Sequence, residues 1–342
     1  MNSINLENTY TSLPPEFFRY TKAETMPDVK LIKTNEQLAD LLDIDISFLK
    51  SQNGLRFLSG KNTENLPESI SLAYAGHQFG HLVPQLGDGR AVLLGDKICQ
   101  DGVRRDIQLK GSGKTYFSRG GDGRAGIGPV IREYLISESM HHLGVPTTRS
   151  LAVLLTGEKI VRAEVSPGAM LARVATSHVR VGTFEFFAIR NQKDHIRKLA
   201  DFMIERSHPD LSGRKNKYEL FFERIVKGQA SLVAQWSSVG FIHGVMNTDN
   251  TSISCETIDY GPCAFMDSYE ANKVFSSIDQ FGRYAFSNQS RVAPWNLSRL
   301  AETILFLISK NTSDAIKVVE EILFDFDKNF NNSLDILSAS KL

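Results

Sequence analysis

A short strand with regular polar–apolar alternation is the feature that most constrains the fold. Residues 106–110 read Asp-Ile-Gln-Leu-Lys. In a strand, Asp106, Gln108 and Lys110 share one face, and the two apolar side chains between them share the other. We expect the apolar face to be buried and Lys110 to project from the opposite face, toward a glycine-rich segment. A strand lysine alone is an ordinary surface charge, so its role depends on the residues that come after it in the chain.

A helix and a polar loop come after this strand. Pro129 suits a first helical position and predicts a helix that carries Glu133 one turn in. A longer helix is predicted near 217–239, followed by the loop His243–Asn250 and then by Asp259 in the triplet Asp-Tyr-Gly. This order is similar to that of protein kinases, in which a strand lysine, a helix glutamate, a catalytic loop and an Asp-aromatic-Gly triplet succeed one another.

These residue types suit nucleotide chemistry. A triphosphate needs a cation on its oxygens, which Lys110 held by Glu133 can supply. Magnesium prefers hard oxygen ligands, which Asn250 and Asp259 offer. A hydroxyl nucleophile needs a carboxylate within hydrogen-bond reach, a role open to Asp249. The spacing differs from that of a kinase, because the loop aspartate and asparagine are adjacent here and are separated by four residues in the kinase motif.

Several sequence blocks resemble the selenoprotein O family of protein adenylyltransferases. The likeness runs from about residue 66 to about residue 300. The blocks that carry it are Tyr74–Gly80, Gln85–Ala91, Gln108–Gly113, Gly120–Ala125, His243–Asn250 and Asp259–Pro262.

The resemblance implies an α+β, protein-kinase-like, two-lobed fold of the pseudokinase architecture. It also implies an enzyme that binds ATP with its phosphates reversed and transfers AMP to Ser, Thr or Tyr hydroxyls of protein substrates, with Mg²⁺ or Mn²⁺. In its terms, Lys110 pairs with Glu133, Asp249 is the base, and Asn250 and Asp259 hold the metal. The implied nucleotide contacts are Gly87, Gly89, Arg90, Lys110, Asp122, Gly123, Arg173, Arg180 and Asp259.

The two implied arginines have a chemical reason. If the γ-phosphate is retained, it needs a guanidinium pocket of its own, and Arg173 and Arg180 can form one. Three alternatives stay open at this point: transfer of UMP, phosphate transfer by a divergent kinase, and a nucleotide-binding pseudoenzyme that acts as a scaffold. A zinc hydrolase is not expected, because Gln78 takes the place of the catalytic glutamate between His77 and His81.

Composition limits the classes of binding partner that we expect for this chain. Lys plus Arg and Asp plus Glu number 39 each, so bulk charge favours neither nucleic acid nor a membrane surface. No apolar run approaches the roughly 20 residues that span a bilayer. The three scattered cysteines, Cys99, Cys255 and Cys263, fit a reducing cytoplasm better than a disulfide framework.

We expect an N-terminal extension over 1–65, a nucleotide-binding N-lobe over 66–175, and a helical C-lobe over 176–342 with the catalytic loop. Relative to the family, we expect the C-lobe to be incomplete, so that two apolar-faced helices near 293–309 and 313–329 support self-association. The other predicted elements are one helical stretch near 35–50, strands at 91–94, 150–155 and 169–174, a hairpin turn at Gly102, and a helix near 195–207.

Overall fold

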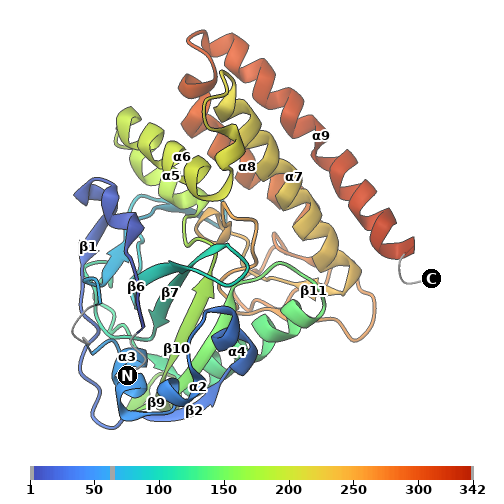
Figure 1. The fold of residues 1–342 in the computed structure, drawn as a ribbon. Helices are drawn as coiled ribbons and strands as arrows, with labels where there is room; N and C mark the ends of the chain where they lie inside the picture. Colours follow the sequence, from blue (N-terminus) through green and yellow to red (C-terminus); the bar gives the residue numbers. More distant parts are fainter. Residues whose placement is uncertain (1–3, 62–65, 340–342) are drawn as a thin grey trace. The chain divides into compact units, whose positions relative to one another are not determined.

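The computed structural model describes residues 4–61 and 66–339 (Figure 1). The chain divides into two compact units. The first, which we call the sheet unit, comprises the chain up to Tyr74 together with Gln85–His142 and Thr147–His178. The second, which we call the helical unit, comprises Ala75–Pro84, Leu143–Pro146 and the chain from Val179 onward. Helices and strands are mixed, which confirms the predicted α+β class.

The sheet unit is built on one antiparallel sheet. In the part of the chain that the structure describes, its strands run in the order β1-β3-β6-β7-β10-β9-β2, and β8 pairs with β10. The strands are β1 (Phe18–Tyr20), β2 (Lys30–Thr34), β3 (Ile70–Leu72), β6 (Ala91–Ile98), β7 (Arg104–Lys110), β8 (Ala125–Gly126), β9 (Arg149–Val161) and β10 (Val165–Ala175). Figure 1 shows β7, β10 and β9 side by side, as their pairing requires.

Two hairpins provide the centre of this sheet. The turn between β6 and β7 contains Gly102 at a φ of 76°, a left-handed conformation that glycine adopts without strain. This confirms the predicted hairpin. The predicted strands at 150–155 and 169–174 lie inside β9 and β10, which are longer at both ends and pair with each other.

The helices of the sheet unit are short except for one. They are α1 (Glu36–Leu41), α2 (Ile46–Leu49), α3 (Gln52–Leu58), α4 (Ile127–His142) and the 3₁₀ turns η1 (Thr9–Ser12) and η2 (Pro15–Phe17). The single helix predicted near 35–50 is wrong, because Asp43 has a φ of 51° and a left-handed residue interrupts the helix there. Helix α4 begins two residues before the predicted Pro129 and packs on β9 and β10.

The strand β7 is buried on both faces, and this corrects the expectation for Lys110. Ile107 and Leu109 are fully buried, as predicted. Gln108 is also fully buried, and Lys110 is only 9% exposed. The polar face of β7 is therefore an interior polar layer, which must be satisfied by partners from neighbouring elements.

The helical unit contains five α-helices in its described residues. They are α5 (Val181–Ala188), α6 (Lys193–Ser207), α7 (Lys217–Ser238), α8 (Gln289–Ile308) and α9 (Thr312–Ala339). Two small strand pairs, β4 (Gly76–Gln78) with β5 (His81–Val83) and β11 (Phe241–Ile242) with β12 (Ala264–Phe265), and the 3₁₀ turns η3 (Pro209–Leu211), η4 (Thr248–Asn250) and η5 (Phe286–Asn288) complete it. Helices α6 and α7 match their predictions within two residues, whereas the apolar run that forms α5 was not predicted.

Helices α7, α8 and α9 pack against one another (Figure 1). The predicted apolar faces are partly buried there, through Leu300 and Ile304 of α8 and Val319 of α9. Phe324 on α9 is 87% exposed. Self-association through these helices stays a prediction. Among the described helices, none combines the length and the apolar character needed to cross a membrane.

Candidate active site

A buried ion cluster occupies the polar layer of the sheet unit. Lys110 Nζ on β7 lies 2.5 Å from Glu133 Oε2 on α4. Arg173 on β10 reaches the other oxygen of the same carboxylate, with Nη1 3.2 Å from Oε1. Because two cations hold one glutamate, the cluster fixes the lysine ammonium and the arginine guanidinium relative to each other.

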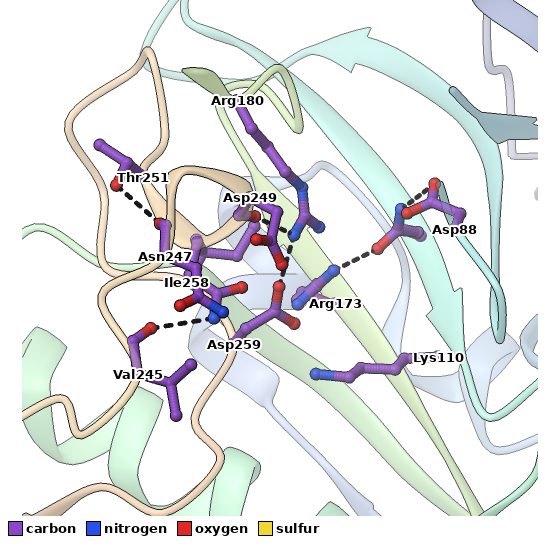
Figure 2. A network of polar contacts seen from close by, with 12 residues as sticks. Asp88, Lys110, Arg173, Arg180, Val245, Asn247, Asp249, Thr251, Ile258 and Asp259 are labelled. Carbon is purple, nitrogen blue, oxygen red and sulfur yellow. Dashed lines mark hydrogen bonds and ion pairs between the residues drawn. The ribbon is translucent and has the colours of Figure 1, made fainter. Parts of the chain in front are cut away.

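The cluster continues across the sheet. Arg173 and Gln108 are cross-strand partners, and Arg173 Nη2 donates to Gln108 Oε1 at 2.5 Å. Gln108 Nε2 then donates to Asp88 Oδ2 at 3.0 Å, and Asp88 also accepts the Leu72 N–H. Figure 2 shows Arg173, Lys110 and Asp88 within this network. Side chains from neighbouring elements therefore supply hydrogen-bond partners for one another, which explains why polar residues can be buried in this sheet.

The predicted glycines lie in two tightly packed loops. Gly87 has a φ of 72°, and a Cβ there would lie 2.3 Å from the Phe117 ring. Gly89 leaves only 2.8 Å to the Phe117 carbonyl oxygen, and Gly123 leaves 1.9 Å to the carbonyl oxygen of Gly113. Glycine is therefore required at all three positions for local packing. Close backbone approach of this kind also suits a phosphate chain.

The other two predicted nucleotide contacts of these loops are exposed. Arg90 has an exposed side chain, and its backbone carbonyl accepts the Gly111 N–H at 2.7 Å. The Asp122 carboxylate lies 2.7 Å from the Arg162 guanidinium, and the hydrogen bond from Arg162 lowers the pKa of Asp122. Neither residue belongs to the buried ion cluster.

In the helical unit, Arg180 joins the two acidic segments. It stands at the N-cap of α5. Its Nη1 donates to the Asp249 backbone oxygen at 2.6 Å and to Asp259 Oδ2 at 2.6 Å (Figure 2). The predicted base and the predicted metal carboxylate are thus held together by one guanidinium. Arg173 and Arg180, which the resemblance implies as contacts of one phosphate, belong to different units.

Asp249 is a buried carboxylate with a raised pKa. It is 7% exposed, and burial raises its pKa to about 6, an effect that the nearby charge of Arg180 and the hydrogen bond from Gln78 partly offset. Gln78 Nε2 donates to Oδ2 at 3.3 Å, and Gly76 leaves no room for a side chain, since a Cβ would lie 2.4 Å from Oδ1. A carboxylate with a pKa near neutrality can accept a proton from a hydroxyl group.

Asn250 and Asp259 fit a divalent metal by the chemistry of their oxygens. Asn250 Nδ2 donates to the Val245 carbonyl at 3.0 Å, which orients the amide so that Oδ1 remains as an acceptor. Asp259 has a φ of 63°, a strained conformation that is often found at functional sites. An amide oxygen and a carboxylate are together oxygen donors of the kind that Mg²⁺ or Mn²⁺ prefers. The described residues contain no group of three or more His, Cys, Asp or Glu side chains that could hold a metal ion.

A second buried network, which the sequence reasoning missed, supports the loop His243–Asn250. Glu185 on α5 contacts His77 Nδ1, and Thr248 Oγ1 donates to its other oxygen at 2.5 Å. The His77 N–H donates to Thr248 Oγ1 at 2.7 Å. Burial raises the pKa of Glu185. The only sequence signals were a lone carboxylate in an apolar run and a histidine within the block Tyr74–Gly80.

His243 ties the loop to the Asp-Tyr-Gly segment. Its Nε2 lies 2.8 Å from the Ile258 carbonyl, and burial lowers its pKa. Asn247 is held in turn by the Tyr284 hydroxyl, which donates to its Oδ1 at 2.6 Å. The loop His243–Asn250 is therefore held through His243, Asn247 and Thr248, and such fixation is a condition for positioning a reacting group.

Comparison with known proteins places this arrangement in context. A family described as protein adenylyltransferase SelO matches residues 1–342. A protein nucleotidyltransferase YdiU from Bradyrhizobium sp. (strain ORS 278) is 55% identical over 327 residues, which cover 96% of this chain and 67% of the relative. The YdiU protein of Rhodopseudomonas palustris (strain BisB5) is 52% identical over 336 residues, covering 98% of this chain and 68% of the relative. The chain thus spans about two thirds of the length of these relatives.

Among solved structures, the chain aligns with ROP2 from Toxoplasma gondii, described as a virulence factor with a protein-kinase fold and no enzymatic activity. The alignment covers 88% of this chain and 95% of that one, at 7% identity and a TM-score of 0.37. A likeness at that level adds nothing to the fold assignment, which rests on the elements themselves. Their chemical order, from the strand lysine to the Asp-Tyr-Gly triplet, is that of protein kinases.

Proposed function

Because the chain belongs to the protein adenylyltransferase SelO family, whose relatives are nucleotidyltransferases, we propose that it transfers AMP from ATP to Ser, Thr or Tyr hydroxyls of proteins. The observation that carries the proposal is Asp249, a buried carboxylate whose pKa is raised to about 6 and which one arginine joins to Asp259. This pairs a base suited to a hydroxyl with a carboxylate suited to a metal.

In the proposed reaction the acceptor hydroxyl loses its proton to Asp249. Its oxygen forms a bond to the α-phosphorus of ATP, the bond between the α-phosphorus and the bridging oxygen breaks, and pyrophosphate leaves. Mg²⁺ or Mn²⁺, when held by Asn250 and Asp259, neutralises phosphate charge. Lys110, oriented by Glu133, supplies a fixed cation to the phosphates.

The remaining predicted residues hold the nucleotide. Gly87, Gly89 and Gly123 let the backbone approach the phosphates, and Arg90 and Asp122 contact the nucleotide from the same loops. Arg173 and Arg180 hold the γ-phosphate, so that it is retained on the leaving group. We assign the reaction to the cytoplasm, and the three cysteines support this, since none of them forms a disulfide in the described part of the chain.

Labelled ATP tests this proposal directly. The protein is incubated with Mg²⁺ or Mn²⁺, a protein mixture, and ATP labelled at either the α- or the γ-phosphate. We expect the α-label on protein and the γ-label only in pyrophosphate. Transfer of the γ-label instead would establish phosphotransfer, and α-labelled UTP run in parallel tests for UMP transfer.

Two variants connect the label to the site. Asp259→Ala should abolish transfer, because it removes a metal carboxylate, whereas Asp267→Ala, an exposed aspartate outside the site, should leave transfer unchanged. Circular dichroism checks that both variants are folded. Full transfer by Asp259→Ala would remove the metal assignment, and transfer of neither label by the wild type would contradict the proposal.

A further inference from the structure

A pocket of about 630 Å³ lies within the helical unit. Its apolar walls include Phe79, Phe281 and Trp295. Arg283 and Arg291 line it as well. A cavity of this size, with aromatic walls and a few charged groups, is typical of a binding site.

The pocket wall is connected to the catalytic loop. The Phe79 N–H lies 3.1 Å from Asn247 Oδ1 and 3.2 Å from the Tyr284 hydroxyl. The preceding residue, Gln78, donates to the carboxylate of Asp249. Two consecutive residues, Gln78 and Phe79, therefore join the Asp249 carboxylate to this wall.

The charge of the pocket is positive. The Arg283 guanidinium lies over the Trp295 ring, 4.6 Å from its centroid, and over the Tyr284 ring, 5.8 Å from its centroid, so its contacts there are with aromatic rings. Arg291 is exposed and has no carboxylate partner within the described part of the chain. The Asp279 carboxylate also lines the pocket, but its two oxygens accept the backbone N–H groups of Arg283 and Tyr284 at 2.9 and 2.8 Å. Two guanidinium groups therefore remain to attract an anion.

The rim of the pocket is apolar and exposed. Phe281 is 96% exposed and Ile278 is 68% exposed. Both belong to the segment that comes after the Asp-Tyr-Gly triplet, and neither side chain contributes to a core. Large apolar side chains in such a position, next to charged groups, are typical of a protein-binding surface.

We propose that this pocket seats the acceptor polypeptide. An apolar side chain of the substrate packs against Phe281 and Trp295, and an Asp or Glu carboxylate of the substrate binds Arg283 and Arg291. A hydroxyl a few residues away then reaches Asp249. This inference rests on the proposed function, and it adds a substrate class: hydroxyl-bearing segments that are both acidic and apolar.

Two labelled peptides of equal length test the proposal without any chemistry. Each contains one Tyr; in one it is flanked by Glu and Leu, and in the other by Lys and Gly. Fluorescence anisotropy without nucleotide measures binding to the full chain. We expect the acidic, apolar peptide to bind at least about tenfold more tightly, and Phe281→Ala and Arg291→Glu each to weaken its binding by about tenfold.

Matched variants elsewhere on the helical unit serve as controls. Phe324→Ala removes another phenylalanine that is 87% exposed, and Arg214→Glu reverses another exposed arginine. Both should leave peptide binding unchanged. Phe281 and Arg291 are exposed as well, so their substitution should not unfold the protein, and thermal melting checks this.

The outcomes separate this inference from the proposed function. Equal binding of the two peptides, or unchanged binding by both pocket variants, overturns the docking site even if the α-label is transferred. A concentration-dependent dimer that Phe281→Ala dissociates would assign the pocket to a second copy of the chain and would also overturn the inference. Failure of α-label transfer with selective peptide binding intact would contradict only the proposed reaction. In transfer assays Arg291→Glu should raise KM for the acidic peptide and leave kcat unchanged.

Discussion

Replacing Asp249 by Asn removes a charge that is costly to bury. Burial raises the pKa of this carboxyl from 3.8 to about 6, so the folded protein binds its proton more tightly than the unfolded chain does. Between these two values, the stability of the folded state falls as the pH rises, because the native state holds more protons than the unfolded state. Above about pH 6 the full cost of burying the charge is present, and below 3.8 it is absent.

The pKa difference sets the magnitude. At about 1.36 kcal/mol per pKa unit, the ionised carboxyl costs ~3 kcal/mol at about pH 7.5 and ~1.5 kcal/mol at about pH 5. The asparagine amide does not titrate. If its NH₂ group took the position of Oδ1, which has no hydrogen-bond partner, burial of that group would destabilise the variant by ~1–3 kcal/mol at every pH. The test is therefore how the stability difference changes with pH. The free energy of unfolding of Asp249→Asn minus that of the wild type should be ~1.5 kcal/mol larger at about pH 7.5 than at about pH 5.

Tryptophan fluorescence can isolate the relevant unit. Trp236 and Trp295 are the two tryptophans of the chain, and both belong to the helical unit that contains Asp249. Urea unfolding of the wild type and the variant, followed by this signal in EDTA at the two pH values, gives the four free energies of unfolding. A stability difference that stays the same within ~0.5 kcal/mol between the two pH values would refute the reasoning. The variant should also lose nucleotide transfer, since the proposed base is gone.

Three other substitutions probe the site. Gly76→Ala would place its Cβ 2.4 Å from Oδ1 of Asp249, the proposed base, so kcat should fall strongly. Gly128→Ala, with nothing within 4 Å of the new Cβ, should leave kcat unchanged in the same assay. Lys110→Met should reduce transfer by about 100-fold or more, and Lys114→Met, which changes an exposed lysine, should not; equal rates for the two would contradict the role of the buried cation. Arg173→Ala should weaken ATP binding by roughly 1.5–3 kcal/mol and AMP binding much less, and calorimetry that finds equal losses would exclude a γ-phosphate contact.

The fold could be predicted where the local pattern was strong. Helices α6 and α7 and the β6–β7 hairpin follow from their periodicity and turn glycine. The region 35–50 could not be divided correctly, because the left-handed Asp43 leaves no mark in an otherwise helical pattern. Strands of three residues such as β4 and β5 have too few positions for any periodicity to appear.

The sequence allowed the residues of the candidate site to be named, but not their burial or their hydrogen-bond partners. The resemblance named Lys110 and Glu133, and the structure shows them paired. The burial of the polar face of β7 depends on Arg173, a cross-strand neighbour 65 residues away from Gln108, so the local alternation could not reveal it. The contact between His77 and Glu185 joins residues 108 positions apart, which no local pattern reports.

The hairpin β4–β5 has a consequence for how the protein folds. The chain passes between its two units after residues 74, 84, 142, 146 and 178, so no single cut separates them. The His77 N–H that holds Thr248 is synthesised 171 residues before its partner. During synthesis the hairpin can therefore make this contact only after the chain up to residue 248 has emerged from the ribosome. Non-local pairing of this kind slows folding, so we expect the helical unit to acquire its structure late and the loop that carries Asp249 to be among the last parts to become ordered.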